Sequence, residues 1–396
     1  MKILQLCKKF PYPLKDGESV AVTFLAKALN ELGCEVTLLA MNTSKHYLDL
    51  ETLPKSFNHY KAIHTVDIDN RLKPAEAFKA LIKGENYFLT RFESAEYAEK
   101  IRELLKEEKF DIIQFETLQT LIYAQEDIFG ESQAKLVLRS HNVEHEIWER
   151  MVKNSKFGLK KWYLNRLTKQ LKKFELSSIN EVDSLVAITQ RDMDYLRKSG
   201  FSGVGHITPI GLETSHYTAD WSSFDKKPSL SFIGSLDWMP NLEGVQWFLK
   251  NVMPNLNGIE LHLAGRNTPK ELLEMKIPNI VIHGEVESSV SFINTHSLMI
   301  VPLFSGSGMR VKILEGLALG RVILTTSIGA EGIHAKDGEH LFIVDSAADF
   351  IAKINFCINN PERLKIISEN AKRFVTAHFD NLKIAAALKE HYVGLC

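Results

Sequence analysis

The stretch VPLFSGSGMRVKILEGLALGRVILTT, Val301 to Thr326, contains the features that decide the fold. An apolar run at 298–303 breaks into a Ser-Gly-Ser-Gly turn, a helical pattern follows, and a second apolar run closes the stretch. This order is typical of a β-strand that leads from its carboxyl end into a helix. It predicts a parallel sheet, and the turn lies where such sheets bind their ligands.

The same alternation of short apolar runs and helical patterns extends along the whole chain. Strands are predicted at residues 2–7, 34–40, 61–68, 111–116, 135–141, 184–189, 229–235, 259–265, 280–285, 297–303, 321–326 and 341–345. Unbroken apolar strands between helices are covered on both faces, which predicts an α/β fold with parallel sheets. A segment rich in turn formers, residues 207–229, interrupts the alternation and is predicted to link two domains.

The bulk composition is that of a globular protein with two domains. The 396 residues are too many for one ordinary core; 45% are hydrophobic and 24% are charged. A net charge of -1 argues against a nucleic-acid partner. Four scattered cysteines without a CxxC pair favour a reducing compartment, and the apolar core of MKILQLCKKFPYP is too short for a signal peptide. No apolar run is long enough to span a bilayer, so a cytoplasmic protein is predicted.

The glycine-rich turn at 305–308 has the chemistry of an anion site. We expect it to join the strand to a helix that begins near Met309. The first N–H groups of such a helix, together with its dipole, favour negative charge. Gly306 and Gly308 allow a ligand to approach the backbone closely.

Three charged residues of this helix extend the prediction. Arg310 and Lys312 are expected in the first turn, where positive charge opposes the dipole unless a phosphate offsets it. Glu315 follows in the second turn, within reach of hydroxyl groups on the phosphate's carrier. Together they predict a site for a nucleotide diphosphate with its ribose. The alternative is a plain turn with an Arg310–Glu315 surface pair, because neither GxxxxGK[ST] nor a complete dinucleotide fingerprint is present.

The segment GSGMRVKILEGLALGRVILTTSIGAEGI, residues 306–333, resembles the signature of group 1, family 4-like retaining glycosyltransferases, which have the GT-B fold. The resemblance implies that Glu315 holds the ribose of a nucleotide sugar. Ser307 stands where the family's usual motif has its first glutamate. A branch of the family instead carries Gly-x-Gly-x-Arg-x-Lys-x-x-Glu, as this chain does, which implies that Arg310 and Lys312 face the diphosphate.

Further segments carry the resemblance along most of the chain. FPYPLKDGESVAVTFLAKALNELGCEVTLLA resembles the family's first loop and helix, and LSFIGSLDWMPNLEGVQWF resembles the first strand and loop of its donor domain. LVLRSHNVEHEIWERM resembles the strand end that places a histidine in the cleft, and the base is expected near IHGEVE, residues 282–287. The catalytic residues implied by the resemblance are His141, Arg310 and Lys312. The implied nucleotide-binding residues are Gly17, Gly234, Ser235, Gly284, Gly308, Met309, Arg310, Lys312 and Glu315.

The resemblance implies two doubly wound, Rossmann-like domains that face each other across a cleft. Residues 1–207 would form the acceptor-side domain and residues 208–379 the donor-binding domain, with a helix at 380–396 packing back on the first domain. The implied activity is that of a hexosyltransferase. It would act on a nucleotide-diphosphate sugar and a glycan or lipid-linked acceptor, without metal or further cofactor, in cell-surface polysaccharide or glycoconjugate synthesis. A nucleotide-sugar epimerase of the same fold and a non-catalytic nucleotide-sugar-binding relative stay open as alternatives.

Two patterns are similar to metal sites, but no metal is predicted. His141, Glu144 and His145 have the H-x-x-E-H spacing of inverse zinc peptidases, which need both histidines on one helix. KLVLRS reads as a buried strand, so His141 is expected at its end and His145 in the next helix. A histidine with a structural hydrogen bond is the remaining alternative. Asp67 and Asp69 form an Asp-x-Asp, for which a solvated strand end is favoured.

The stretch KNSKFGLKKWYLNRLTKQLKKFE, residues 153–175, carries eight lysines or arginines. Apolar residues recur in it at helical spacing: Leu159, Tyr163, Leu167, Leu171 and Phe174, with Trp162 alongside. One interpretation is a helix that packs this stripe on the core and exposes its charges to solvent. The other is a peripheral contact with an anionic membrane, at the inner face for a cytoplasmic protein.

Overall fold

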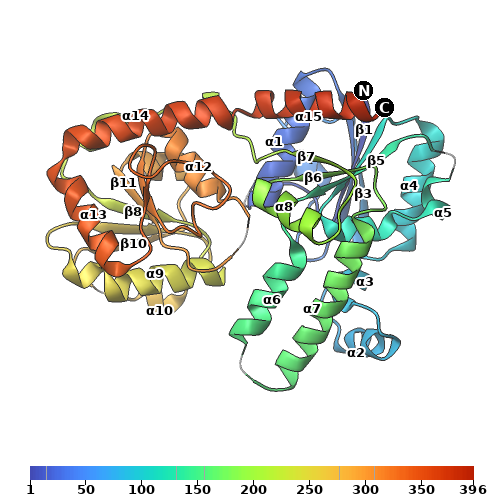
Figure 1. The fold of residues 1–396 in the computed structure, drawn as a ribbon, viewed down its shortest axis with the longest axis horizontal. Helices are drawn as coiled ribbons and strands as arrows, with labels where there is room; N and C mark the ends of the chain where they lie inside the picture. The colour runs from blue at the N-terminus through green and yellow to red at the C-terminus, as the bar shows by residue number, and fades with distance from the viewer. Residues whose placement is uncertain (15, 131, 156, 276, 307) are drawn as a thin grey trace. The chain divides into compact units, whose positions relative to one another are not determined.

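The computed structural model describes residues 1–14, 16–130, 132–155, 157–275, 277–306 and 308–396. The chain divides into two compact units, Met1–Gly211 with Asn381–Cys396, and Leu212–Asp380. Each unit contains a parallel β-sheet with helices on its faces (Figure 1). The predicted α/β fold with two doubly wound sheets is therefore confirmed.

The sheet of the first unit has the order β3-β2-β1-β4-β5-β6-β7 over the described residues. Its strands are β1 (Lys2–Cys7), β2 (Glu35–Thr43), β3 (Ala62–Ile68), β4 (Ile112–Glu116), β5 (Lys135–Ser140), β6 (Ser184–Ala187) and β7 (Val204–Ile207). All adjacent strands pair in parallel, and the order reverses between β1 and β4. The sequence predicted every one of these strands except β7. This strand is short, lies at the sheet edge and exposes Val204, so it carries no apolar run.

Helices cover both faces of this sheet (Figure 1). They are α1 (Gly17–Glu31), α2 (Pro74–Lys83), α3 (Tyr87–Thr90), α4 (Ala95–Glu107), α5 (Glu126–Phe129), α6 (Glu144–Asn154), α7 (Leu159–Ser178), α8 (Gln190–Lys198) and α15 (Asn381–Leu395). The first of them shows why the sequence folds this way. Asp16 caps α1 by accepting a hydrogen bond from the Ser19 N–H at 3.0 Å, and Gly33 ends it with φ 81°.

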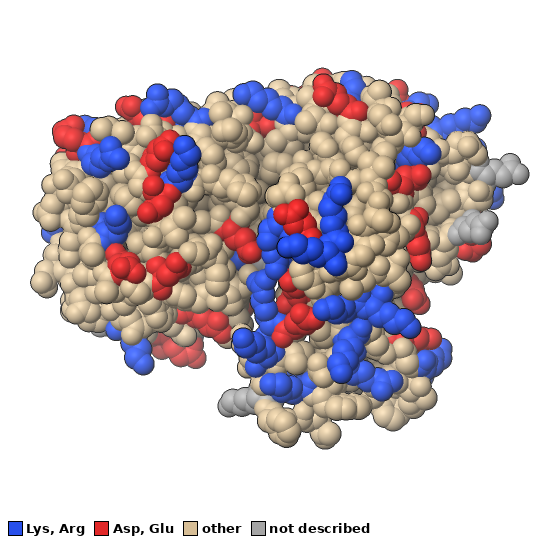
Figure 2. Space-filling view, in the orientation of Figure 1, with Lys and Arg blue, Asp and Glu red and all other residues tan. Residues whose placement is uncertain are grey.

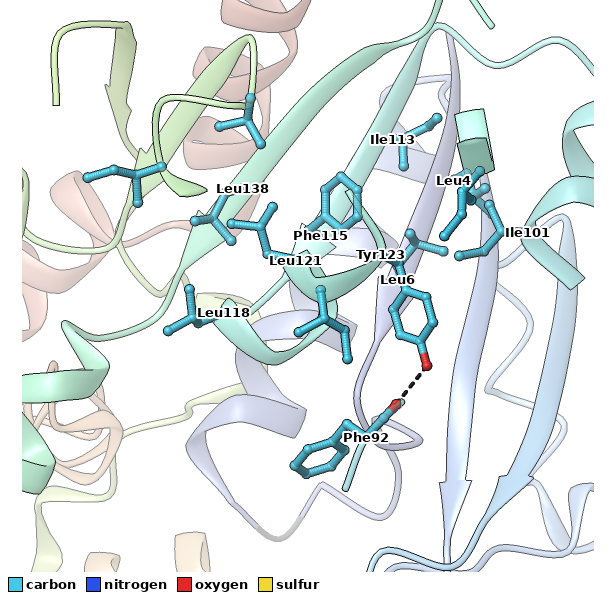
Figure 3. Packing of buried hydrophobic residues seen from close by; sticks show 14 of the residues in the cluster. Leu4, Leu6, Phe92, Ile101, Ile113, Phe115, Leu118, Leu121, Tyr123 and Leu138 are labelled. Carbon is cyan, nitrogen blue, oxygen red and sulfur yellow. Dashed lines mark hydrogen bonds between the residues drawn. The ribbon is translucent and has the colours of Figure 1, made fainter. Parts of the chain in front are cut away.

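Buried side chains on the two faces of the first sheet form separate clusters. Leu4 and Leu6 of β1 pack with Ile101, Phe115 and other residues on one face (Figure 3). Ile3, which precedes Leu4 in the same strand, packs on the other face with residues of α1 and α15. This alternation is expected of a strand that is covered on both sides, and it stabilises the sheet by burying both sets of side chains.

The helix at the chain's carboxyl end, α15, packs on α1 within the first unit (Figure 1). Ala385, Leu388 and Tyr392 are fully buried there. Lys389 Nζ donates to the Leu32 carbonyl at 2.7 Å, close to where α1 ends. The last 16 residues therefore belong to the same folded unit as residues 1–211.

The basic stretch at 153–175 does not form one continuous helix. The helix α6 ends at Asn154, and α7 begins at Leu159 after Gly158, whose φ of 143° is unfavourable for other residues. The two helices form a hairpin that extends away from the sheet (Figure 1). No helix formed by the described residues combines the length and the apolar character that a bilayer span requires.

The second unit repeats the same design with the sheet order β10-β9-β8-β11-β12-β13. Its strands are β8 (Leu230–Ile233), β9 (Leu261–Ala264), β10 (Ile280–Gly284), β11 (Leu298–Val301), β12 (Val322–Thr325) and β13 (Phe342–Ile343). Its helices are α9 (Met239–Asn251), α10 (Lys270–Leu273), α11 (Ser289–Asn294), α12 (Val311–Ala318), α13 (Ala347–Asn359) and α14 (Pro361–His378). The strands agree with the predicted apolar runs. The order reverses between β8 and β11.

Candidate active site

The loops after β8 and β11 start at the point where the strand order of the second unit reverses. In doubly wound sheets, ligands bind outside the carboxyl ends of the strands at such a point. The loop after β8 begins with Gly234 and Ser235, and the loop after β11 leads through Gly308 into α12. The topology therefore brings together the strand ends that carry most of the predicted nucleotide-binding residues. Ser307 lies outside the described residues.

The N-terminus of α12 is strongly positive. Arg310 is the N-cap residue rather than part of the first turn, and no side chain among the described residues caps the helix. Its guanidinium is buried, donates to the Gly308 carbonyl at 2.8 Å, and lies 5.8 Å from the centroid of the Trp238 ring. Gly306 and Gly308 have φ of 104° and 79°, a backbone conformation that favours glycine, and Met309 is buried. This end of the helix can therefore attract an anion.

Lys312 lies in the first turn of α12 and is partly buried. Its Nζ donates to Asn241 Oδ1 at 2.7 Å and lies 4.6 Å from the centroid of the Phe232 ring. Burial and the charge of Arg310 lower the pKa of Lys312 to about 7, although Glu315 opposes the shift. A diphosphate beside Lys312 would favour the charged ammonium group. Binding of such an anion would therefore be coupled to binding of a proton.

Glu315 lies in the second turn of α12, as predicted, and is partly buried. Its Oε1 accepts a hydrogen bond from the Tyr217 hydroxyl at 3.0 Å. Burial raises the pKa of this carboxyl group, whereas the Tyr217 bond and the charge of Lys312 oppose the increase. Tyr217 could not be identified from the sequence, because it stands in the segment predicted to be a linker and matches no motif. Its hydroxyl fixes the orientation of the Glu315 carboxylate.

Asn241 connects the loop after β8 to α12. Its Nδ2 donates to the Ser235 carbonyl at 2.8 Å, while its Oδ1 accepts from Lys312 Nζ. A methyl group at Gly234 would lie 2.5 Å from Lys312 Nζ and 2.9 Å from Asn241 Nδ2, so alanine at this position would displace these side chains. The sequence analysis did not predict Asn241. Only the fold reveals that it bridges two loops that are distant in sequence.

The predicted base-binding stretch starts at the end of β10. Gly284 has φ of 68°, and the pairing of β10 with β9 shifts register between Ile282 and Gly284. The Gly284 carbonyl accepts a hydrogen bond from the Gly265 N–H at 2.7 Å. This bulge turns the backbone where the strand ends, and such a turn is a common place for main-chain contacts with a ligand.

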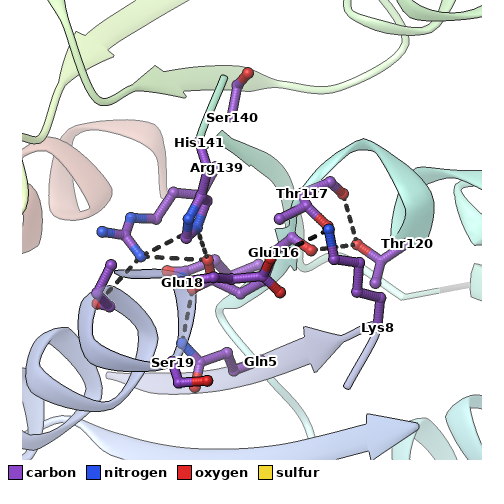
Figure 4. A network of polar contacts seen from close by, with 12 residues as sticks. Gln5, Lys8, Glu18, Ser19, Glu116, Thr117, Thr120, Arg139, Ser140 and His141 are labelled. Atoms are coloured by element: carbon purple, nitrogen blue, oxygen red, sulfur yellow. Dashed lines mark hydrogen bonds and ion pairs between the residues drawn. The ribbon is translucent and has the colours of Figure 1, made fainter. Parts of the chain in front are cut away.

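The first unit holds a buried polar network beside His141 (Figure 4). His141 follows β5 and lies 2.7 Å, through Nε2, from Glu116 Oε2 at the end of β4. Arg139 Nη1 donates to the same oxygen at 3.2 Å, and Gln5 Nε2 donates to Glu116 Oε1 at 2.8 Å. Burial alone would raise the pKa of Glu116, but Arg139, His141 and Gln5 lower it to about 2. Glu116 is therefore a fixed anion that orients the His141 ring.

A second polar group lies beside this network, where β1 ends. Lys8 Nζ lies 3.2 Å from Glu18 Oε2 and 3.2 Å from Gln119 Oε1. Burial raises the pKa of nearby Glu144 to about 7, although Lys8 opposes the shift. Gly17, the first residue of α1, precedes Glu18 directly. The carboxyl ends of β1, β4 and β5 thus carry several polar residues that can face a polar ligand.

The structure argues against zinc at H-x-x-E-H. His141 lies before α6 and His145 lies within it, so the two are not one turn apart on one helix. His145 Nδ1 lies 2.6 Å from Glu175 Oε2, and His145 Nε2 lies 2.8 Å from the Tyr195 hydroxyl. Glu175 also accepts hydrogen bonds from the N–H groups of Glu144 and His145 at 2.9 and 3.0 Å. His145 therefore helps to hold the start of α6 in place.

The Asp-x-Asp pattern also has a structural explanation. Asp67 Oδ1 accepts a hydrogen bond from Asn42 Nδ2 at 3.0 Å. Asp69 pairs with Arg71 at 2.8 Å and with Lys73 at 3.0 Å, and these bonds lower its pKa. Within the described ranges, no group of three or more histidine, cysteine or acidic side chains is arranged to hold a metal ion.

The predicted site residues are divided between the two units. Gly17 and His141 belong to the first unit, and the remaining predicted residues belong to the second. Within the second unit, the structure brings Lys312 beside Gly234 and Arg310 beside Gly308. The functional roles of these residues remain predictions.

Family comparisons agree with this architecture. Residues 16–216 match the family described as Glycosyltransferase Family 4, and residues 227–360 match Glycosyl transferases group 1. The chain therefore belongs to the group 1, family 4 glycosyltransferases, and it is a glycosyltransferase with the GT-B fold.

Particular relatives cover essentially the whole chain. A 44.6 kDa protein of Klebsiella pneumoniae, described as uncharacterized and in the cps region, is 23% identical over 409 residues, with 98% of each chain covered. Sucrose-phosphate synthase from Thermosynechococcus elongatus is 14% identical with a TM-score of 0.76, covering 100% of this chain and 99% of that chain. HepE of Anabaena, solved in complex with UDP, is 16% identical with a TM-score of 0.70, covering 100% of both chains. These similar structures share the fold.

Proposed function

We propose that this enzyme moves a sugar from a nucleotide-diphosphate donor to a hydroxyl group of a glycan or lipid-linked acceptor, with retention of the anomeric configuration. The observation that carries the proposal is the group formed by Arg310, Lys312 and Glu315 at the start of α12. Two cations and a helix N-terminus match a diphosphate, and an oriented carboxylate matches a ribose diol. HepE, a similar structure, has been solved with UDP and with UDP-glucose, which supports a nucleotide sugar as donor.

In the proposed reaction, the bond between the sugar's anomeric carbon and the diphosphate oxygen breaks while the acceptor oxygen bonds to that carbon. The acceptor proton passes to an oxygen of the leaving diphosphate. Arg310, Lys312 and the N-terminus of α12 stabilise the charge that develops on the diphosphate. They supply electrostatically what a metal ion supplies elsewhere, so we propose neither a metal nor a further cofactor. His141, held by Glu116, positions the transferring sugar.

We propose a role in the synthesis of a cell-surface polysaccharide or glycoconjugate, which the relative in a cps region supports. We also propose that the enzyme acts in the cytoplasm, with a peripheral membrane contact through residues 153–175. Such a contact would suit a lipid-linked acceptor.

The test is a product analysis with a panel of nucleotide sugars. The donor is first selected as the nucleotide sugar that raises the melting temperature most, since ligands that bind only the folded state stabilise it. Release of nucleoside diphosphate is then followed with and without lipid and glycan extracts, and the product's anomeric configuration is determined by NMR. Acceptor-dependent release with a retained anomer supports the proposal. Conversion of the donor without an acceptor would indicate an epimerase instead, and binding without turnover would indicate a non-catalytic relative.

A further inference from the structure

The helix α2 is attached to the α6–α7 hairpin by one of its faces only. Asn86 Nδ2 donates to the Leu167 carbonyl at 2.8 Å, and Gln170 Nε2 donates to the Gly84 carbonyl at 2.7 Å. Ala80 is buried with Leu167 in this contact. The inner face of α2 thus uses Ala80 with the partly buried Ala77 and Leu81, whereas Phe78 and Ile82 are exposed.

Large apolar side chains of α2 and of the hairpin are exposed to solvent. In and beside α2, Leu72, Phe78 and Ile82 are 75%, 61% and 71% exposed, and the last two lie one helical turn apart. At the hairpin tip, Phe157 is 100% exposed and Leu159 86%. Trp162 and Met151 of the same hairpin are also exposed. A single exposed apolar residue is ordinary, but several gathered from two packed segments mark an interaction surface.

The helix α7, which carries part of these apolar side chains, is strongly basic. The stretch from Leu159 to Phe174 has six lysines and arginines and no aspartate or glutamate. Lys160, Arg166 and Lys169 are exposed there. Figure 2 shows lysine and arginine side chains gathered over the hairpin and α2, in the lower part of the view. The surface therefore attracts an anionic partner.

We infer that the outer face of α2 and the tip of the hairpin together form a docking surface for an anionic lipid bilayer. The surface, called here the lipid face, consists of Leu72, Phe78, Ile82, Phe157, Leu159 and Trp162 with the neighbouring lysines. Flexible lysines beside aromatic and aliphatic side chains suit the boundary between headgroups and acyl chains, because the stems enter the apolar layer while the ammonium groups contact anionic headgroups. Aliphatic residues such as Leu72 and Ile82 cannot stack on bases, which disfavours a nucleic acid.

The membrane contact proposed above for residues 153–175 would thus include α2 as well as the hairpin. The evidence for it is the set of exposed side chains, and it does not depend on the transfer reaction. Its test therefore needs neither donor nor acceptor, and either proposal can fail without the other.

The experiment is flotation of the full-length protein with phosphatidylcholine vesicles, prepared with and without phosphatidylglycerol. We expect binding only to the anionic vesicles, and less binding at high salt. The double variants Phe78→Ser with Ile82→Ser, and Phe157→Ser with Leu159→Ser, should each weaken binding at least about tenfold, because each removes two apolar side chains from the contact. Lys160→Glu with Lys169→Glu should have an effect of similar size.

Val393→Ser and Ile366→Ser are matched controls, since both change exposed apolar residues outside the lipid face, on α15 of the first unit and on α14 of the second. They should leave vesicle binding unchanged, and every variant should keep the wild-type melting temperature because the changed side chains are exposed. Wild-type protein that does not bind the anionic vesicles would overturn the inference. If the variant with Phe78→Ser and Ile82→Ser binds the anionic vesicles as tightly as the wild type, α2 does not belong to the lipid face. A changed oligomeric state in that variant, with vesicle binding unchanged, would instead indicate a second copy as the partner.

Discussion

Binding of a nucleoside diphosphate should be accompanied by uptake of a proton at Lys312. The pKa of Lys312 is about 7 without ligand, against an ordinary value of 10.5. At pH 8 the side chain is therefore roughly nine-tenths neutral. A diphosphate beside it restores the ammonium group, so we expect an uptake of about 0.9 proton per ligand bound. The diphosphate itself is almost fully ionised at this pH and contributes little.

The assay is isothermal titration calorimetry at pH 8 in buffers with different enthalpies of ionisation. The slope of the observed enthalpy against the buffer's ionisation enthalpy gives the number of protons taken up. Lys312→Met should abolish the uptake and weaken binding, whereas Lys312→Arg should abolish the uptake while keeping a permanent charge. Absence of proton uptake in the wild type, or equal uptake in Lys312→Met, would show that Lys312 does not take up a proton when the diphosphate binds.

The same shift has a consequence for stability. Because the folded-state pKa of Lys312 is lowered, the unfolded chain binds more protons between pH 7 and 10.5. The free energy of unfolding should therefore rise with pH across this window, by at most about 5 kcal/mol from this group. Lys312→Met should be more stable than the wild type at pH 6 in urea denaturation, and the difference should shrink towards pH 10. Lys312 would thus lower the stability of the protein without ligand, and its proposed contact with the diphosphate would explain why a lysine stands there.

Other variants test the two strand-end clusters. Glu116→Gln should lose about 3 kcal/mol of stability at neutral pH. Because the folded-state pKa of Glu116 is about 2, this loss should disappear as the pH falls from 4.5 to 2. Urea denaturation across this pH range measures the loss. The pKa of Glu144 is raised instead of lowered. The free energy of unfolding of Glu144→Gln should therefore equal that of the wild type near pH 4.5 and exceed it by up to about 3 kcal/mol above pH 7, in the same assay. Gly234→Ala should displace Lys312 and weaken diphosphate binding about tenfold, as measured by calorimetry. Gly394→Ala is the control, because its added methyl group meets nothing within 4 Å, and it should leave diphosphate binding unchanged. Full diphosphate affinity in Gly234→Ala would contradict the packing described here.

The parallel sheets could be predicted because each buried strand is an apolar run bounded by turn residues. The edge strand β7 could not, since Val204 faces solvent and Gly205 and His206 interrupt its apolar residues. The basic stretch was wrongly predicted as one helix, because apolar periodicity continues across the break at Gly158. Two of its five stripe residues, Leu167 and Leu171, are core, while Leu159 at its start is exposed.

The candidate site shows a similar division. Arg310, Lys312 and Glu315 could be identified because they stand close together in one motif. Asn241 and Tyr217 could not, because their contacts with that motif depend on how loops distant in sequence converge at the strand ends. The network around Glu116 was missed for the same reason, since its members come from several strands.

We propose that the start of α12 binds the phosphates of a nucleotide. This binding can be measured by calorimetry of wild type and Arg310→Ala, each titrated with a nucleoside and with its diphosphate for each common base. We predict that the variant loses at least about tenfold in affinity for the diphosphate while its affinity for the nucleoside is unchanged. Equal losses for both ligands, or no loss for either, would contradict the assignment.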